Sequence, residues 1–244
     1  MQRKKSPPLK SNKVRSLVRL FVRGCFPLLL FFTLAYAQGT GIPPNESRTI
    51  GTKLPDVMLI DSHGKSFNLY SLSGKPIILS PIYTHCSSAC PIITDSLKKV
   101  VYKLGTPGRD FWVLSFTFDP KDRLEDLRRF QKEHGIDGRG WKVVMAKDSQ
   151  ELFKLTDAID FRFMSEQNSR DFIHPNLLVF ISADMVIKKY VYGVVFKYED
   201  MKKALDYAEG NEDLLERLRP YLFFVGLLGF GVSSLYLLLK IFKR

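Results

Sequence analysis

Two cysteines four residues apart, Cys86 and Cys90, constrain this chain more than any other feature, because they lie between a strand-like run and a helix-like run. Residues 76–83 are apolar and of strand length, whereas residues 92–104 have helical spacing. Pro91 suits the first turn of that helix, where a missing N–H leaves no partner unsatisfied. Two thiols at such a turn either form a redox disulfide or bind a soft metal ion.

Strand-like and helix-like segments alternate along most of the chain. We expect strands at residues 57–60, 66–69, 76–82, 111–118, 141–145, 176–181 and 186–195, and helices at 92–104, 123–134, 149–159 and 199–209. This alternation predicts an α/β sandwich with a partly parallel sheet. One domain at residues 51–210 is long enough for a proper core. We expect a flexible lead-in at residues 38–50 and a charged connector at 211–219.

The positive charge of the chain is concentrated at its ends. The formal net charge is +12, of which the first 37 residues contribute +8 and the last five +3, which leaves +1 for residues 38–239. This nearly neutral middle has no evident phosphate-binding surface. We therefore expect no nucleic-acid partner.

Residues 1–37 have the layout of a secretory signal peptide, with a basic start, a short apolar stretch and an Ala-Tyr-Ala end that predicts cleavage after Ala37. A lipoprotein is disfavoured because Cys25 precedes the apolar stretch. If the leader is retained as an anchor, the following domain still lies outside the cytoplasm. Either interpretation places Cys86 and Cys90 in an oxidising compartment.

Residues 220–239 are twenty residues without a formal charge. At about 1.5 Å per residue a helix of this length crosses a bilayer core of about 30 Å. A buried core helix is the alternative, but the basic residues 240–244 that follow favour a span with a cytoplasmic tail. We expect a single-pass protein of the inner (cytoplasmic) membrane, with its domain facing the periplasm or cell exterior.

The chemistry of the cysteine pair is not decided by its position alone. Cys90 is expected at the start of a helix, where free N–H groups and the helix dipole stabilise a thiolate. A thiolate is both a better ligand and a better redox group. The C-x-x-x-C spacing, with Cα atoms roughly 6 Å apart on a helical turn, permits a disulfide and also lets both sulfurs face one ion. An inert disulfide is disfavoured, since closing five residues constrains little of the unfolded chain.

A third metal ligand would come from the four histidines. His63 is expected in a hairpin turn, His134 at a helix end, and His85 beside Cys86 with its side chain diverging. His174 precedes the strand at 176–181, and its loop can reach the same end of the sheet as the cysteines. Two thiolates and one imidazole suit copper. Zinc usually takes a fourth strong ligand, and iron–sulfur clusters need more cysteines.

Residues 83–91 (Tyr-Thr-His-Cys-x-x-x-Cys-Pro) resemble the signature of the Sco/SenC proteins, thioredoxin-fold copper proteins tied to cytochrome c oxidase assembly. Residues 69–76 resemble the strand lead-in of that family, and residues 115–122 its Asp-Pro stretch. His174 falls where the family has its histidine ligand, and the resemblance covers about residues 48–200. It implies a thioredoxin-like sandwich with a central mixed sheet. It also implies that Cys86, Cys90 and His174 bind copper as Cu(I) or Cu(II).

The resemblance further implies a metallochaperone that delivers copper to subunit II of cytochrome c oxidase, or reduces the thiols of its copper site. A thiol reductant such as a periplasmic thioredoxin-like protein would be a second partner. The chain departs from the family at residues 87–89, which are Ser-Ser-Ala in place of a Pro- and Asp-containing spacer. It also departs beside the histidine, where Ile173 replaces an acid and Pro175 a small polar residue.

Two other functions remain open. A thiol–disulfide oxidoreductase or thiol peroxidase would use Cys86 for attack and Cys90 to resolve the intermediate, and would not need His174. A redox sensor that signals through the membrane helix is the third possible function.

The remaining acids and aromatic residues have structural explanations. Asp119 and Asp122 precede the helix at 123–134, and we expect them to cap it. The aromatic residues of the strands are expected in the core (Phe111, Trp112, Phe116, Phe118, Trp141).

Overall fold

The computed structural model describes residues 41–166, 171–211, 218 and 221–231. The expected signal peptide and cytoplasmic tail lie outside these residues, as do much of the connector and residues 232–239 of the expected span. Residues 221–231 are helical. Within the described ranges, no helix has both the length and the apolar character that a membrane crossing requires.

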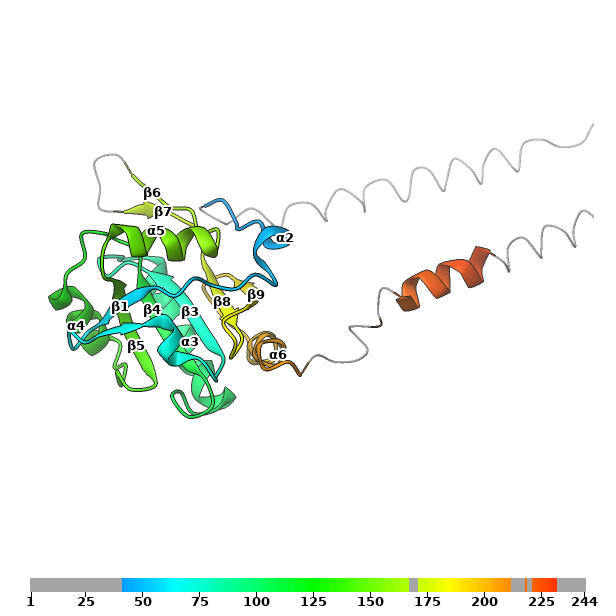
Figure 1. Cartoon of the computed structure of the whole chain (residues 1–244), viewed down its shortest axis with the longest axis horizontal. Coiled ribbons are helices and arrows are strands. Elements are labelled where there is room, and N and C mark those ends of the chain that lie inside the picture. Colours follow the sequence, from blue (N-terminus) through cyan, green and yellow to red (C-terminus); the bar gives the residue numbers. More distant parts are fainter. Residues whose placement is uncertain (1–40, 167–170, 212–217, 219–220, 232–244) are drawn as a thin grey trace, which may run out of the picture. The chain divides into compact units, whose positions relative to one another are not determined.

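A mixed seven-stranded sheet forms the centre of the domain (Figure 1). Its strands are β1 (Met58–Asp61), β2 (Ser66–Asn68), β3 (Ile77–Ile82), β4 (Trp112–Thr117), β5 (Trp141–Ala146), β8 (Leu177–Ile181) and β9 (Ile187–Tyr192). They are ordered β2-β1-β5-β4-β3-β8-β9, with β3, β4 and β5 mutually parallel and the outer pairs antiparallel. This confirms the α/β fold with a central mixed sheet.

Helices cover the sheet, which explains why its central strands are almost entirely buried. The helices are α2 (Glu46–Thr49), α3 (Ala89–Leu104), α4 (Leu124–Glu133), α5 (Ser149–Ala158) and α6 (Tyr198–Glu209), with a 3-10 turn, η1, at Leu69–Leu72. All residues of β3 and β8 are buried, because helices pack on both faces of the sheet. Helix α3 packs against α6, whereas α5 lies on the opposite side of the sheet (Figure 1).

Three local features differ from the sequence-based expectation. Helix α3 begins at Ala89 and not at residue 92, which places Cys90 inside its first turn. The segment expected to be a flexible lead-in contains α2 and a buried Thr49. Two short strands, β6 (Met164–Ser165) and β7 (Phe172–Ile173), form a separate antiparallel pair. Elements of two to four residues are too short to show a hydrophobic period.

Strand directions bring three separate loops to one edge of the sheet. Parallel strands β3 and β4 end at the same edge, so the segments that follow them are neighbours. Strand β8 runs antiparallel to β3, with Leu79 beside Val179 and Ile77 beside Ile181. The residues just before β8 therefore lie next to those just after β3. This register places His174 at the same edge as the cysteine loop.

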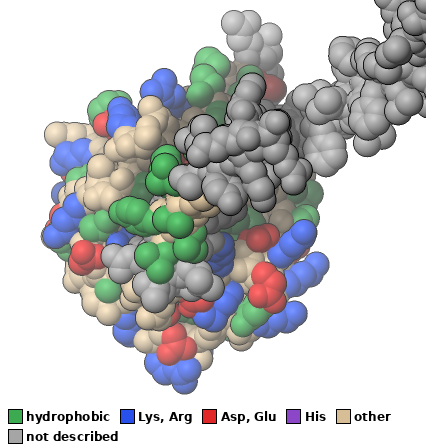
Figure 2. Space-filling view, turned by 90° about the vertical axis from the view of Figure 1, so that its right-hand side faces the viewer, with side chains coloured by type: hydrophobic (Ala, Val, Ile, Leu, Met, Phe, Trp, Pro, Cys, Tyr) green, Lys and Arg blue, Asp and Glu red, His purple; other side chains and the backbone are tan. Residues whose placement is uncertain are grey.

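Charged side chains of both signs are scattered over one face of the domain. Figure 2 shows Asp and Glu interspersed among Lys and Arg on one face, with no large area of a single charge. This distribution agrees with the nearly neutral composition of residues 38–239. A continuous basic stripe, which a nucleic-acid-binding surface needs, is not seen on this face.

Candidate metal and redox site

Cys86 lies in the loop after β3, and Cys90 lies in the first turn of α3. Both are free thiols and both are buried, with 7% and 0% of their surfaces exposed. The backbone N–H of Cys90 donates to the Cys86 sulfur over 3.3 Å, and Ser88 Oγ lies 3.7 Å from that sulfur. The N-terminus of α3 thus directs hydrogen-bond donors at Cys86.

The surroundings of the two thiols shift their pKa values in opposite directions. A hydrogen bond from the Cys90 thiol, assisted by the Tyr83 hydroxyl and by backbone N–H groups, lowers the pKa of Cys86 to about 4 although burial acts to raise it. The hydrogen bond to the Cys86 sulfur and burial raise the pKa of Cys90 well above its usual value. Cys86 is therefore a thiolate at neutral pH, and Cys90 keeps its proton.

His174 lies between β7 and β8 and is 4% exposed. Its ring is enclosed by the rings of Phe118, Tyr83 and Phe161, whose centroids lie 5.0, 5.8 and 5.9 Å away. Nδ1 donates to the carbonyl of Pro175 over 3.1 Å, which leaves the imidazole lone pair on Nε2. Burial lowers the pKa of His174, although the nearby charge of Cys86 acts to raise it.

Cys86, Cys90 and His174 therefore lie at the same buried edge of the sheet, where the charge of Cys86 acts on His174, although Cys90 and His174 are 84 positions apart in sequence. A thiolate, a thiol that can lose its proton, and a neutral imidazole with a defined tautomer form a soft donor set. Such a set fits Cu(I) or Cu(II) better than harder ions. The hydrogen bond that fixes the tautomer is the usual partner of a metal-binding histidine.

Asp122 was expected to cap a helix, and this expectation was wrong. At the N-terminus of α4, the carboxylate of Asp126 accepts instead from the backbone N–H of Arg123 over 2.9 Å. The buried carboxylate of Asp122 accepts from the backbone N–H of Thr84 (2.9 Å), the Thr84 hydroxyl (2.7 Å) and the Thr117 hydroxyl (2.5 Å). It thereby joins the end of β4 to the residues just before Cys86.

His85 points away from the cysteines, as its position beside Cys86 predicted. Its Nδ1 lies 3.0 Å from Asp122, and its Nε2 lies 3.3 Å from the guanidinium of Arg129. The ligand atoms of His85, Asp122 and Asp126 are close enough to hold a cation. However, Arg129 contacts Asp126 at 2.8 Å and already supplies the positive charge.

The other two histidines have the local roles expected of them. His63 is exposed in the turn between β1 and β2. His134 ends α4, and its ring lies 3.2 Å from Asp95. Neither belongs to the cysteine site.

Tyr83 was not singled out by sequence reasoning, yet its hydroxyl lies 3.1 Å from Asp171, and its hydrogen bond to Cys86 lowers the pKa of that thiol. Replacing Tyr83 with Phe should raise the pKa of Cys86 by several tenths to about one unit, since a single neutral hydrogen bond contributes about 1 kcal/mol. Alkylation rate of Cys86 against pH measures this midpoint. Tyr70→Phe, at a hydroxyl bonded to the Leu54 carbonyl, is the control. A midpoint unchanged in Tyr83→Phe contradicts the role.

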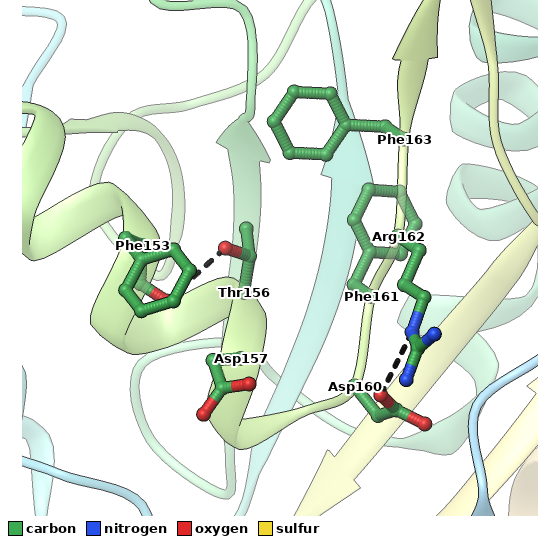
Figure 3. A pocket seen from close by; sticks show the side chains of 7 residues that line it. All are labelled: Phe153, Thr156, Asp157, Asp160, Phe161, Arg162 and Phe163. Carbon is green, nitrogen blue, oxygen red and sulfur yellow. Dashed lines mark hydrogen bonds and ion pairs between the residues drawn. The ribbon is translucent and has the colours of Figure 1, made fainter.

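A cavity of about 320 Å³ is lined by residues of α5 and of the segment that follows this helix (Figure 3). Phe161 belongs both to this cavity and to the enclosure of His174. Figure 3 shows the Arg162 guanidinium turned toward the carboxylate of Asp160, which it contacts at 3.3 Å. The lining residues are Phe153, Thr156, Asp157, Asp160, Phe161, Arg162 and Phe163.

Comparison with known proteins gives a consistent result. A family model described as SCO1/SenC matches residues 50–208. A solved structure from Aquifex aeolicus, described as a candidate electron transfer protein, is 63% identical and has a TM-score of 0.64, covering 66% of this chain and 95% of that one. The copper-bound ScoI of Arabidopsis thaliana is 19% identical and has a TM-score of 0.56, with 66% of this chain and 100% of that chain covered. At this identity the similarity is one of fold. A curated SCO1 homologue from Bacillus subtilis is 27% identical over 90 residues, which are 36% of this chain and about half (47%) of that relative.

Proposed function

Because this chain belongs to the SCO1/SenC family, we propose that it is a membrane-tethered copper chaperone whose ligands are Cys86, Cys90 and His174. The observation that carries the proposal is the pairing of a buried thiolate with a histidine whose Nδ1 is tied to a carbonyl. Cys86 offers a charged sulfur, Cys90 releases its proton when it joins the ligand set, and His174 offers Nε2. The copper-bound Arabidopsis relative supports copper as the cargo.

The client in this proposal is subunit II of cytochrome c oxidase, which would receive copper or have its site thiols reduced. Residues 220–239 would hold the domain at the inner membrane, facing the periplasm or cell exterior, near a membrane-embedded oxidase. The exposed apolar side chains of the helix at 221–231 are compatible with such an anchor. A periplasmic thioredoxin-like reductant would keep both thiols reduced before loading.

A copper titration of the full chain in detergent, with reduced thiols, tests this proposal. We expect one copper per chain, and we expect His174→Ala to weaken binding by more than about 100-fold, since loss of a ligand exceeds the 10–100-fold loss of an outer partner. Cu(II) is followed by thiolate charge-transfer absorption and Cu(I) by chelator competition. His134→Ala is the matched control. Binding that is unchanged in His174→Ala would exclude this ligand set.

The difference in pKa between the two thiols also favours a second function, thiol–disulfide exchange. The Cys86 thiolate would attack a partner disulfide, release one partner thiolate and form a mixed disulfide. Cys90 would then lose its proton and attack the Cys86 sulfur, which releases the second partner thiolate and leaves a Cys86–Cys90 disulfide. Failure to bind copper, together with reversible cycling of that disulfide, would assign the chain to this class.

A further inference from the structure

The segment before α2 makes a very close backbone contact with the candidate ligand His174. A Cβ atom at position 41 would lie 2.3 Å from the carbonyl carbon of His174 and 2.4 Å from the nitrogen of Pro175. Side-chain carbons do not approach backbone atoms this closely, so only glycine fits without displacing the His174–Pro175 peptide. Gly41 therefore braces the backbone of His174.

The segment that follows Gly41 is anchored to the domain at two places. The backbone N–H of Asn45 donates to Asp160 over 2.7 Å, and Arg48 contacts the same carboxylate at 3.0 Å. Further along, Gly51 donates to the carbonyl of Ile187 over 2.8 Å, at the start of edge strand β9. These bonds hold the lead-in against the domain and prevent Gly41 from moving away.

Asp160 and Phe161 connect this anchor to the ring of His174. Asp160 is buried and has a left-handed backbone (φ 46°), which directs its carboxylate at the lead-in while the next side chain turns inward. Phe161 packs on the ring of His174, with centroids 5.9 Å apart. One dipeptide thus holds the lead-in and encloses the imidazole.

We propose that the N-terminal lead-in is a clamp that positions His174 for copper, with Gly41 as the positioning residue and Asp160 as its anchor. The inference rests on the proposed function. The backbone of His174 is fixed by Gly41 and its ring by the aromatic enclosure, so Nε2 is held in place before copper arrives. A ligand held in its bound geometry loses less conformational entropy on binding.

Copper titration of the full chain in detergent tests the clamp. Gly41→Ala should weaken Cu(II) binding by about 10–100-fold, the range for loss of an outer partner, and reduce the nitrogen hyperfine coupling in the electron paramagnetic resonance spectrum. Asp160→Asn should act in the same direction by about 10-fold, because asparagine tolerates the left-handed backbone but loses the charge that holds Arg48. The alkylation profile of Cys86 should not change in either variant.

Ile42→Ala is the matched control, since this neighbouring side chain is 63% exposed. If His174→Ala weakens binding but Gly41→Ala and Asp160→Asn do not, the clamp is wrong and the copper site stands. If His174→Ala has no effect, the copper site itself is wrong. An altered Cys86 alkylation profile would indicate general disruption and also overturn the clamp. If Gly41→Ala does not fold, Asp160→Asn decides the question.

Discussion

Replacing Cys86 with serine should abolish copper binding and remove the fast-reacting thiol, whereas Cys90→Ser should leave Cys86 reactive. The reason is that Cys86 alone is a thiolate at neutral pH, held by donors from Cys90 and Tyr83. In Cys90→Ser the backbone N–H at position 90 still donates to the Cys86 sulfur. Alkylation kinetics of the full chain separate the two variants, and copper titration of Cys86→Ser measures the loss of binding.

The same thiolate makes stability depend on pH. The folded pKa of Cys86, about 4, lies below its ordinary value of 9.0. The thiolate therefore stabilises the folded domain fully above about pH 9, and this contribution declines as pH falls and is lost below about pH 4. Unfolding midpoints of the reduced protein and of Cys86→Ser should diverge as pH rises across this range. The assigned protonation states would be contradicted if the two thiols reacted at equal rates. They would also be contradicted if the unfolding midpoints of the reduced protein and of Cys86→Ser changed with pH in parallel.

Replacing Asp122 with alanine should destabilise the domain by about 3–5 kcal/mol, a large part of the 5–15 kcal/mol that a domain typically has. Asp122 is buried and accepts hydrogen bonds from Thr84, Thr117 and His85. Its removal leaves the buried donors of Thr84 and Thr117 without an acceptor, and each such group costs about 1–3 kcal/mol. Chemical denaturation followed by far-ultraviolet circular dichroism measures the loss.

Asp119→Ala provides the matched control for Asp122→Ala. Asp119 is also buried after β4, but its side chain accepts only from the backbone N–H of Lys121 among the bonds described (2.8 Å). We expect a loss of about 1 kcal/mol. Similar losses for both variants would mean that Asp122 does not hold the cysteine loop. A larger loss for Asp122, together with weaker copper binding, would support its role in positioning residues 84–86.

Long segments with a strong pattern were predicted well. The runs that became β3, β4, β5, β8 and α3 to α6 were assigned to the right type, with ends shifted by a few residues. Buried strands that are apolar on both faces, and helices of ten or more residues, show their period in the sequence. The short elements α2, β6 and β7 were not predicted, because tertiary contacts stabilise them.

Sequence motif alone identified Cys86 and Cys90 as a chemical pair, since their spacing at a strand-to-helix turn has few other uses. The sequence also indicated His174 as a candidate ligand, because this residue precedes a strand. Only the tertiary structure decided that Asp122 supports the cysteine loop, that Tyr83 stabilises the thiolate and that Gly41 contacts the His174 backbone. These roles depend on which strand ends meet at one edge of the sheet, and such long-range proximity leaves no local pattern in the chain.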